Sequence, residues 1–163
     1  YIMDYNRVVK DLNGLTTKEF FDKIQSIFNI EESKGQVKPN KKGEVGLYIE
    51  NKWYKLTFKD EYLKTDDPVE VLDVAMLQKY VLDVILGIED PRTSKRIDFV
   101  GGIRGLGELE KRVNSGEMKL AFAMNPTSVD ELINIADAGK IMPPKSTWFE
   151  PKLRDGLFIH FLD

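Results

Sequence analysis

Apolar and polar residues alternate with a period of two in two neighbouring segments, residues 45–49 and 54–58. The apolar side chains of each segment share one face, and they are Val45, Leu47, Ile49, Tyr54, Leu56 and Phe58. Polar residues, Glu50-Asn51-Lys52, separate the two segments. This pattern predicts an antiparallel hairpin with one buried face.

A helical period replaces this alternation in four other segments, which are predicted to be helices over residues 17–28, 67–87, 106–113 and 128–138. Two of these helices begin with a capping box, formed by Thr16 with Glu19 and by Ser128 with Glu131. Apolar residues nearly encircle the helix at 67–87, which starts at Asp67-Pro68 and ends at Gly87. We therefore expect it in the centre of the core. Residues 33–43 are rich in lysine and lack an apolar period, which predicts a mobile surface loop.

Short apolar runs predict strands at 97–100, 118–124 and 157–162, and residues 1–13 are strand-like in places. The C-terminal half therefore alternates as β-α-β-α-β. Short links of this kind favour a right-handed crossover with locally parallel strands. Combined with the hairpin, the pattern predicts an α+β fold in which helices pack on a mixed sheet. A chain of 163 residues, 42% of them hydrophobic, is expected to form a single domain.

Composition excludes several classes of function. The formal net charge is -3 with both signs interspersed, which gives no strong field for nucleic acid or acidic lipid. The chain has no cysteine, so disulfides and thiolate metal sites are excluded, and a reducing, cytoplasmic location is expected. The longest apolar helix is interrupted by charged residues and is not expected to enter a membrane.

The stretch at residues 141–153 reads Ile-Met-Pro-Pro-Lys-Ser-Thr-Trp-Phe-Glu-Pro-Lys-Leu and is explained least by periodic structure. Its three prolines exclude a helix or a central strand, which leaves a shaped loop. The loop collects cations, hydroxyls, an aromatic ring and a carboxylate that suit an anionic ligand such as phosphate: Lys145, Ser146, Thr147, Trp148, Glu150 and Lys152. The alternative is a stiff lid that closes the end of the sheet, with its aromatic residues as anchors.

Other candidate residues have a plain structural interpretation as well as a functional one. The glycine-rich turn at 101–107 could hold an anion with the help of Arg104, or could simply require positive φ, and it matches no known phosphate-binding motif. His160 is the only histidine and could be catalytic or a core residue. Adjacent carboxylates at 66–67 and 89–90 could hold magnesium or act as caps. No metal site is predicted.

Several segments resemble blocks of a known family. They are Leu86-Gly-Ile-Glu-Asp-Pro-Arg92, Phe99-Val-Gly-Gly102, Asn125-Pro-Thr-Ser128, Ile135-Ala-Asp-Ala-Gly139, Met142-Pro-Pro-Lys-Ser-Thr-Trp-Phe-Glu-Pro-Lys-Leu153 and Gly156-Leu-Phe-Ile-His160. Together they resemble the C-terminal signature of the uncharacterised, mainly bacterial family called domain of unknown function ten-fifteen. Tyr5-Asn-Arg-Val-Val9 is similar to a segment that usually has histidine where this chain has Asn6, which makes Arg7 a candidate without a neighbouring imidazole.

Longer members of that family carry an N-terminal part with a Gly-His-His-Arg motif that resembles ParB-like proteins, a fold class that includes nucleotide-using enzymes and small-molecule serine kinases. The motif is absent here. The resemblance therefore implies that the chain is the C-terminal portion of a longer protein, with the ParB-like part as its partner. A role that rests on the missing motif cannot be carried over.

Two hypotheses of function follow. In the first, the chain supplies an anion-binding loop to a nucleotide- or phosphate-using small-molecule enzyme such as a phosphotransferase, with a magnesium nucleotide as cofactor. The isolated chain is then expected to be inactive, and the catalytic residues stay unknown. In the second, the chain is a noncatalytic module for regulation, homodimerisation or partner binding. A nucleic-acid partner is disfavoured in both, because the chain is acidic and has no basic stripe.

Overall fold

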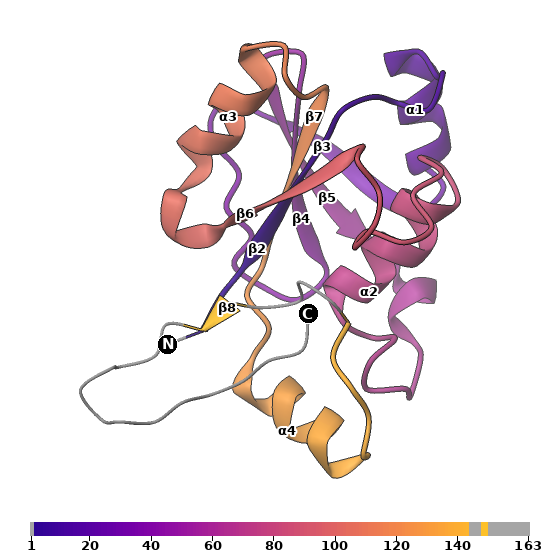
Figure 1. The fold of residues 1–163 in the computed structure, drawn as a ribbon. Coiled ribbons are helices and arrows are strands. Elements are labelled where there is room, and N and C mark those ends of the chain that lie inside the picture. Colours follow the sequence, from indigo (N-terminus) through magenta and orange to yellow (C-terminus); the bar gives the residue numbers. More distant parts are fainter. Residues whose placement is uncertain (1, 144–147, 150–163) are drawn as a thin grey trace, which may run out of the picture.

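A computed structural model of the chain describes residues 2–143 together with 148 and 149. Its main element is a six-stranded antiparallel sheet with the strand order β3-β5-β4-β7-β2-β6 (Figure 1). The strands are β2 (Tyr5–Val9), β3 (Phe28–Ser33), β4 (Glu44–Ile49), β5 (Lys52–Phe58), β6 (Ile97–Gly101) and β7 (Leu120–Met124). A separate pair is formed by β1 (Ile2–Met3) and β8 (Trp148–Phe149).

Helices cover both faces of the sheet. α1 (Thr17–Ile24) and α2 (Asp73–Leu77) lie on one side, α3 (Leu106–Asn114) lies on the other, and α4 (Val129–Asp137) lies beyond one end of the sheet (Figure 1). Short helical turns are η1 (Asp60–Leu63), the π-helical η2 (Gln78–Asp83) and η3 (Gly102–Arg104). The predicted α+β class is confirmed. In the part of the chain that is described, no helix is long and apolar enough to cross a membrane.

The predicted hairpin is confirmed as β4 and β5, in which Leu47 pairs with Tyr54. Glu50 and Asn51 both have positive φ, the conformation that a two-residue hairpin turn requires. Both predicted capping boxes are also present, at Thr16 and Ser128. These elements were predictable because each depends on residues only a few positions apart.

The expected pair of parallel strands is wrong. β6 and β7 run in the same direction, but β2 lies between them and is antiparallel to both. The crossover through α3 therefore spans an inserted strand that comes from the start of the chain. Strand order of this kind is decided by pairing between distant segments, so the local pattern could not reveal it.

Three helix and loop boundaries also differ from the prediction. α1 ends at Ile24, and after a turn at 25–27 the chain forms β3, which pairs with β5 along its whole length. The helix expected over 67–87 starts only at Asp73, because Asp67 caps a separate turn and Leu72 has extended backbone geometry. Within the predicted surface loop at 33–43, Val37 is buried and packs in the smaller core cluster. The expected strand at 157–162 lies outside the described residues.

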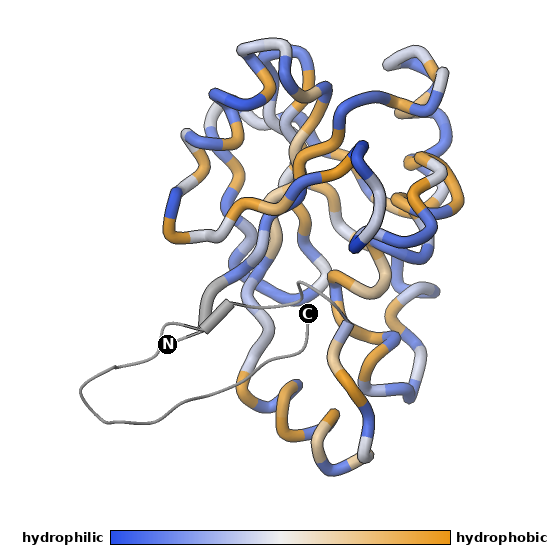
Figure 2. The backbone as a smooth tube through the Cα atoms, viewed as in Figure 1, coloured by the Kyte–Doolittle hydropathy of each residue, from blue (hydrophilic) through white to orange (hydrophobic). Residues whose placement is uncertain are grey.

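The sheet separates two cores. The larger core contains Phe20, Leu47, Leu82 and Phe122 and lies between the sheet, α1 and α2. The smaller core lies between the sheet and α3 and includes Val8 and Leu109. The predicted central position of the 72–86 segment is confirmed, since most of its apolar residues are buried. Figure 2 shows hydrophobic residues interspersed with hydrophilic ones along the strands and the helices.

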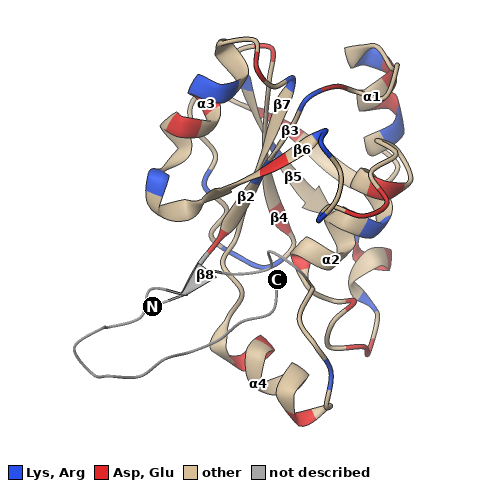
Figure 3. Cartoon of the chain, in the orientation of Figure 1, with Lys and Arg blue, Asp and Glu red and all other residues tan. Residues whose placement is uncertain are grey.

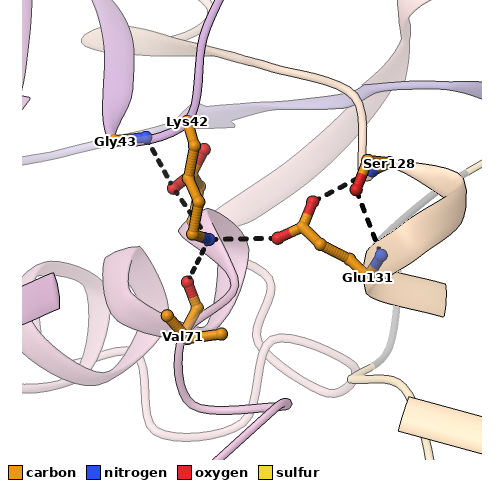
Figure 4. A network of polar contacts seen from close by, with 6 residues as sticks. Lys42, Gly43, Val71, Ser128 and Glu131 are labelled. Carbon is orange, nitrogen blue, oxygen red and sulfur yellow. Dashed lines mark hydrogen bonds and ion pairs between the residues drawn. The ribbon is translucent and has the colours of Figure 1, made fainter. Parts of the chain in front are cut away.

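A polar network ties α4 to α2 (Figure 4). Lys42 donates to the carbonyl of Val71 and, at 3.0 Å, to the carboxylate of Glu131. Buried Asp73 accepts from the backbone N–H of Gly43 at 3.0 Å. Asp73 also lies 4.0 Å from the ammonium of Lys42. One lysine therefore connects two acidic side chains from different helices.

Candidate functional site

A cavity of about 400 Å³ opens at the sheet end where β2 begins, on the face that carries the larger core. We call it the Arg7 pocket. Its walls come from β2, α2, η2, the turn at 89–92 and the segment that follows α4. The lining residues are Arg7, Val74, Gln78, Glu89, Asp90, Pro91, Arg92 and Pro143. The pocket has a size suited to a small molecule.

Arg7 is the most unusual residue of this pocket because its charged side chain is only 4% exposed. Arg7 belongs to β2, which lies between β6 and β7. The register places it opposite Phe99 of β6 and Phe122 of β7. The guanidinium lies over the Phe99 ring and donates to the carbonyl of Tyr5. Burial lowers the pKa of Arg7 to about 10, although Asp4 opposes the shift. Arg7 therefore remains a cation at neutral pH.

The turn at 89–92 forms the rim of the pocket. Asp90 accepts from the backbone N–H of Arg92 at 3.0 Å and from its Nε at 3.2 Å. These hydrogen bonds lower the pKa of the Asp90 carboxyl. Gln78 donates to the carbonyl of Ile88 at 2.8 Å and so fixes the start of the turn against η2. The rim thus presents the guanidinium of Arg92 beside the carboxylates of Glu89 and Asp90.

The predicted proline loop begins at the wall of this pocket, because Pro143 is one of the lining residues. The loop residues Lys145, Ser146, Thr147, Glu150 and Lys152, as well as His160, lie outside the described residues. Trp148 is described only as part of β8, where its backbone pairs with Met3. The anion-binding role of the loop therefore stays a prediction.

The glycine-rich turn has a structural explanation. Gly105 has φ +77°, a conformation that favours glycine. A Cβ at Gly102 would lie 2.3 Å from the nearer carboxylate oxygen of Asp4, so this glycine makes room for a buried acid. Arg104 is exposed on η3 and is not among the residues that line the Arg7 pocket. The structure does not bring it to Arg7.

One carboxylate of the adjacent pair at 66–67 acts as a cap. Asp67 accepts hydrogen bonds from the backbone N–H groups of Val69 and Glu70 and forms an ion pair with Lys140. The hydrogen bond from Lys140 is the main reason that the pKa of Asp67 falls to about 2. Asp66 is exposed. Within the described part of the chain, no group of three acidic or histidine residues could hold a metal ion.

Four lining residues were missed by the sequence prediction: Val74, Gln78, Pro91 and Arg92. Val74 and Gln78 were assigned to a core helix and the other two to a polar turn, and only their position beside Arg7 reveals that they face a cavity. A clue was available in β2, where the polar pair Asn6-Arg7 precedes two valines. Arg7, the 89–92 turn and Pro143 belong to three separate segments that carry the family resemblance, and they meet in one pocket.

Comparison with known proteins bears on the family and the fold of the chain. Residues 1–75 match the family described as Protein of unknown function (DUF1015). Over these residues the match supports the predicted family. The ParB-like N-terminal part that longer family members carry stays a prediction. No curated protein matches the chain.

Two solved structures share the fold at low sequence identity. One is a mutant of a free serine kinase in complex with AMP, with a TM-score of 0.54, 14% identity and coverage of 91% of this chain. The other is a conserved hypothetical protein from Pyrococcus furiosus, with a TM-score of 0.50, 16% identity and 90% coverage. The chain spans about half the length of both, 53% and 54% respectively.

Proposed function

We propose that the chain contributes a phosphate-binding site to a nucleotide-using small-molecule enzyme, of the phosphotransferase class. The observation that carries this proposal is the Arg7 pocket, in which a buried guanidinium faces a cavity that is also lined by Pro143. In the sequence, Pro143 shortly precedes the lysine and hydroxyl residues at 145–147. A buried guanidinium suits a phosphate because its fork of N–H groups matches two oxygens and it stays charged. The fold shared with a kinase solved with AMP supports the same class.

The chemistry expected of such a site is charge neutralisation and positioning. Phosphoryl transfer needs little covalent participation by the protein, which suits a chain without cysteine and with a single histidine. In this proposal Arg7 and Arg92 donate hydrogen bonds to phosphate oxygens. Lys145 and Lys152 neutralise further negative charge on the ligand. Ser146 and Thr147 donate hydrogen bonds, and Trp148 covers the ligand. Glu150 pairs with a loop lysine or helps to bind magnesium.

Magnesium would arrive with the nucleotide. The described residues form no acidic cluster that fits a dedicated site. Mg²⁺ commonly binds through substrate phosphates and one or two carboxylates, and Glu89 offers a carboxylate at the rim. The metal would supply charge stabilisation on the transferred phosphoryl group.

Calorimetry with ADP and with magnesium ATP tests the proposal on the full-length protein. Arg92→Ala and Lys145→Ala should each weaken binding by about tenfold, the usual loss for one charge-assisted contact. Arg96→Ala is the matched control, because Arg96 pairs with Asp11 and does not line the pocket. Equal affinities in the wild type and in both variants would contradict the proposal.

A second candidate is the noncatalytic module, in which α4 provides a contact surface. Val129 and Ile133 lie one helical turn apart and are 58% and 50% exposed, and Ile141 beyond the helix is 84% exposed. Exposed apolar side chains grouped in this way favour an interface. Sedimentation of the wild type and a Val129→Ser, Ile133→Ser variant tests it. A monomeric wild type would exclude homodimerisation through this face.

A further inference from the structure

A second cavity, of about 320 Å³, lies on the opposite face of the sheet. We call it the Asp4 cavity, and its walls include Asp4, Asn6, Lys38, Pro39, Gly102 and Leu106. Side chains alternate across a strand, so Asn6 faces α3 while its neighbour Arg7 faces the larger core. The two cavities are therefore separated by β2 and its neighbours.

Asp4 is the central polar group of this cavity. Asp4 is 8% exposed, and this burial is the main reason that the pKa of its carboxyl is raised. Asn6 hydrogen-bonds to this carboxyl, and the Oδ1 of Asn6 accepts from the backbone N–H of Met124 at 2.9 Å. Because that oxygen is already engaged, the amide nitrogen of Asn6 is the donor to Asp4. The carboxyl is thus held in place by a fixed neighbour.

The backbone around Asp4 is shaped to admit the acid. Gly102 donates its N–H to the carbonyl of Asp4 at 2.8 Å. A side chain at Gly102 would collide with both carboxylate oxygens, at 2.3 Å and 2.9 Å from an added Cβ. The absence of a side chain at Gly102 therefore leaves room for the Asp4 carboxyl. Asp4 in turn places an ionisable group at the wall of the cavity.

Lys38 brings the opposite charge to the same cavity from a different segment. Val37, the residue before Lys38, passes close to β4. A Cβ added at Gly46 would lie 2.6 Å from the carbonyl oxygen of Val37. This close passage and the burial of Val37 and Pro39 fix the backbone on both sides of Lys38. Lys38 itself is exposed at the rim and lowers the pKa of Asp4 through its charge. Among the ion pairs formed by described residues, none joins Lys38 to Asp4.

We propose that the Asp4 cavity binds a small zwitterion of the α-amino acid class, with its ammonium group at Asp4 and its carboxylate at Lys38. A zwitterion carries one positive and one negative group. One small ligand can therefore pair with the carboxylate of Asp4 and the ammonium of Lys38 at the same time. Asn6 would orient the Asp4 carboxyl toward the ammonium. The proposal goes beyond the phosphate site at Arg7 and does not depend on it, because the two cavities share no lining residue.

Thermal shift with the twenty standard amino acids, followed by calorimetry with the strongest, tests the proposal on the full-length protein. The free amino acid should stabilise the protein, because a ligand of the folded state raises the unfolding temperature. Its N-acetyl derivative lacks the ammonium and its amide derivative lacks the carboxylate, so both should bind at least about tenfold more weakly. Absence of a shift with all twenty would overturn the proposal.

Substitutions locate the site. Asp4→Asn and Lys38→Gln should each weaken binding by about tenfold. Lys34→Gln should bind like the wild type, since Lys34 is an exposed lysine of the same loop outside the cavity. Lys38 is exposed, so its variant is expected to fold even if Asp4→Asn does not. Equal binding by the Lys38 and Lys34 variants, or no change in the amide resonance of Gly102 on titration, would overturn the assignment.

Discussion

The guanidinium carbon of Arg7 lies 5.1 Å from the centre of the Phe99 ring. The two residues face each other because β2 and β6 pair in antiparallel register at this position. The ring also meets Tyr5 edge-on, with 6.4 Å between the ring centres. Phe99 thus holds a buried cation in one orientation at the wall of the Arg7 pocket.

Arg7→Lys should destabilise the fold by roughly 2 kcal/mol although it preserves the charge. Lysine cannot place a planar, delocalised cation over the Phe99 ring, and its ammonium is harder to desolvate. Phe99→Leu should cost roughly 1 kcal/mol and is the companion variant that keeps the cation. Urea unfolding followed by fluorescence measures both. An Arg7→Lys protein as stable as the wild type would show that the stacked geometry does not matter.

Asp73 should make stability depend on pH in an unusual direction. Burial raises its pKa from 3.8 to about 6, against the opposing charge of Lys42, and the nearby acids Glu131 and Glu44 raise it further. The folded state therefore holds this proton more tightly than the unfolded state does. Its stabilising contribution is complete below about pH 4 and is lost as the pH rises through about 6.

Asp73→Asn should remove that dependence. Relative to the variant, the free energy of unfolding of the wild type should fall by roughly 2–3 kcal/mol between about pH 4 and pH 7. Asparagine can still accept from Gly43, so the local hydrogen bond is retained. Asp83→Asn, at an exposed position of η2, is the control. Parallel pH profiles for the wild type and Asp73→Asn would contradict the assignment.

Lys42→Gln should raise the pKa of the Asp73 carboxyl above its value in the wild type. The charge of Lys42 is the first of the causes that lower this pKa, so its removal leaves the effect of burial less opposed. Carbon-detected NMR titration of the Asp73 side chain measures the shift. A lower or unchanged pKa in the variant would show that Lys42 does not act on Asp73 through its charge.

Gly46→Ala should destabilise the protein by about 1–3 kcal/mol, because the added methyl group would overlap the carbonyl of Val37. Gly35→Ala should be neutral or slightly stabilising, since nothing lies within 4 Å of its added Cβ and its φ is not positive. Thermal unfolding of this matched pair checks the close passage of the 36–39 segment over β4. Similar melting temperatures for the two variants would contradict it.

Glu110→Ala should loosen α3 from the hairpin. The Glu110 carboxylate accepts from the indole N–H of Trp53 at 2.7 Å and from Gln36 at 2.9 Å. Its loss leaves a buried donor unpaired, which costs about 1–3 kcal/mol. Glu110→Gln keeps an acceptor and should lose less. Hydrogen exchange in α3 reports the difference, and equal protection in the two variants would exclude this tether.

Positive and negative residues are interspersed along the sequence, which has a formal net charge of -3. Figure 3 shows acidic and basic residues of both signs spread over the helices and loops. A small anionic ligand remains compatible with the chain, because it requires a few placed cations such as Arg7 and not a surface field.

The sequence by itself determined the parts of the fold that depend on near neighbours. The hairpin at Glu50-Asn51 and the capping boxes at Thr16 and Ser128 follow from residues within a few positions of each other. The segments that carry the family resemblance could also be identified by reading along the chain, and they pointed to Arg7 and to the proline loop.

Only the tertiary structure decided which of these segments meet. β2 enters the sheet between β6 and β7, so a strand from the start of the chain brings Arg7 to the 89–92 turn and to Pro143. The same insertion places Asp4 beside Gly102 and Lys38 on the opposite face. Such contacts arise from strand pairing over long separations, which is governed by the global burial of both sheet faces and leaves no local periodicity to read.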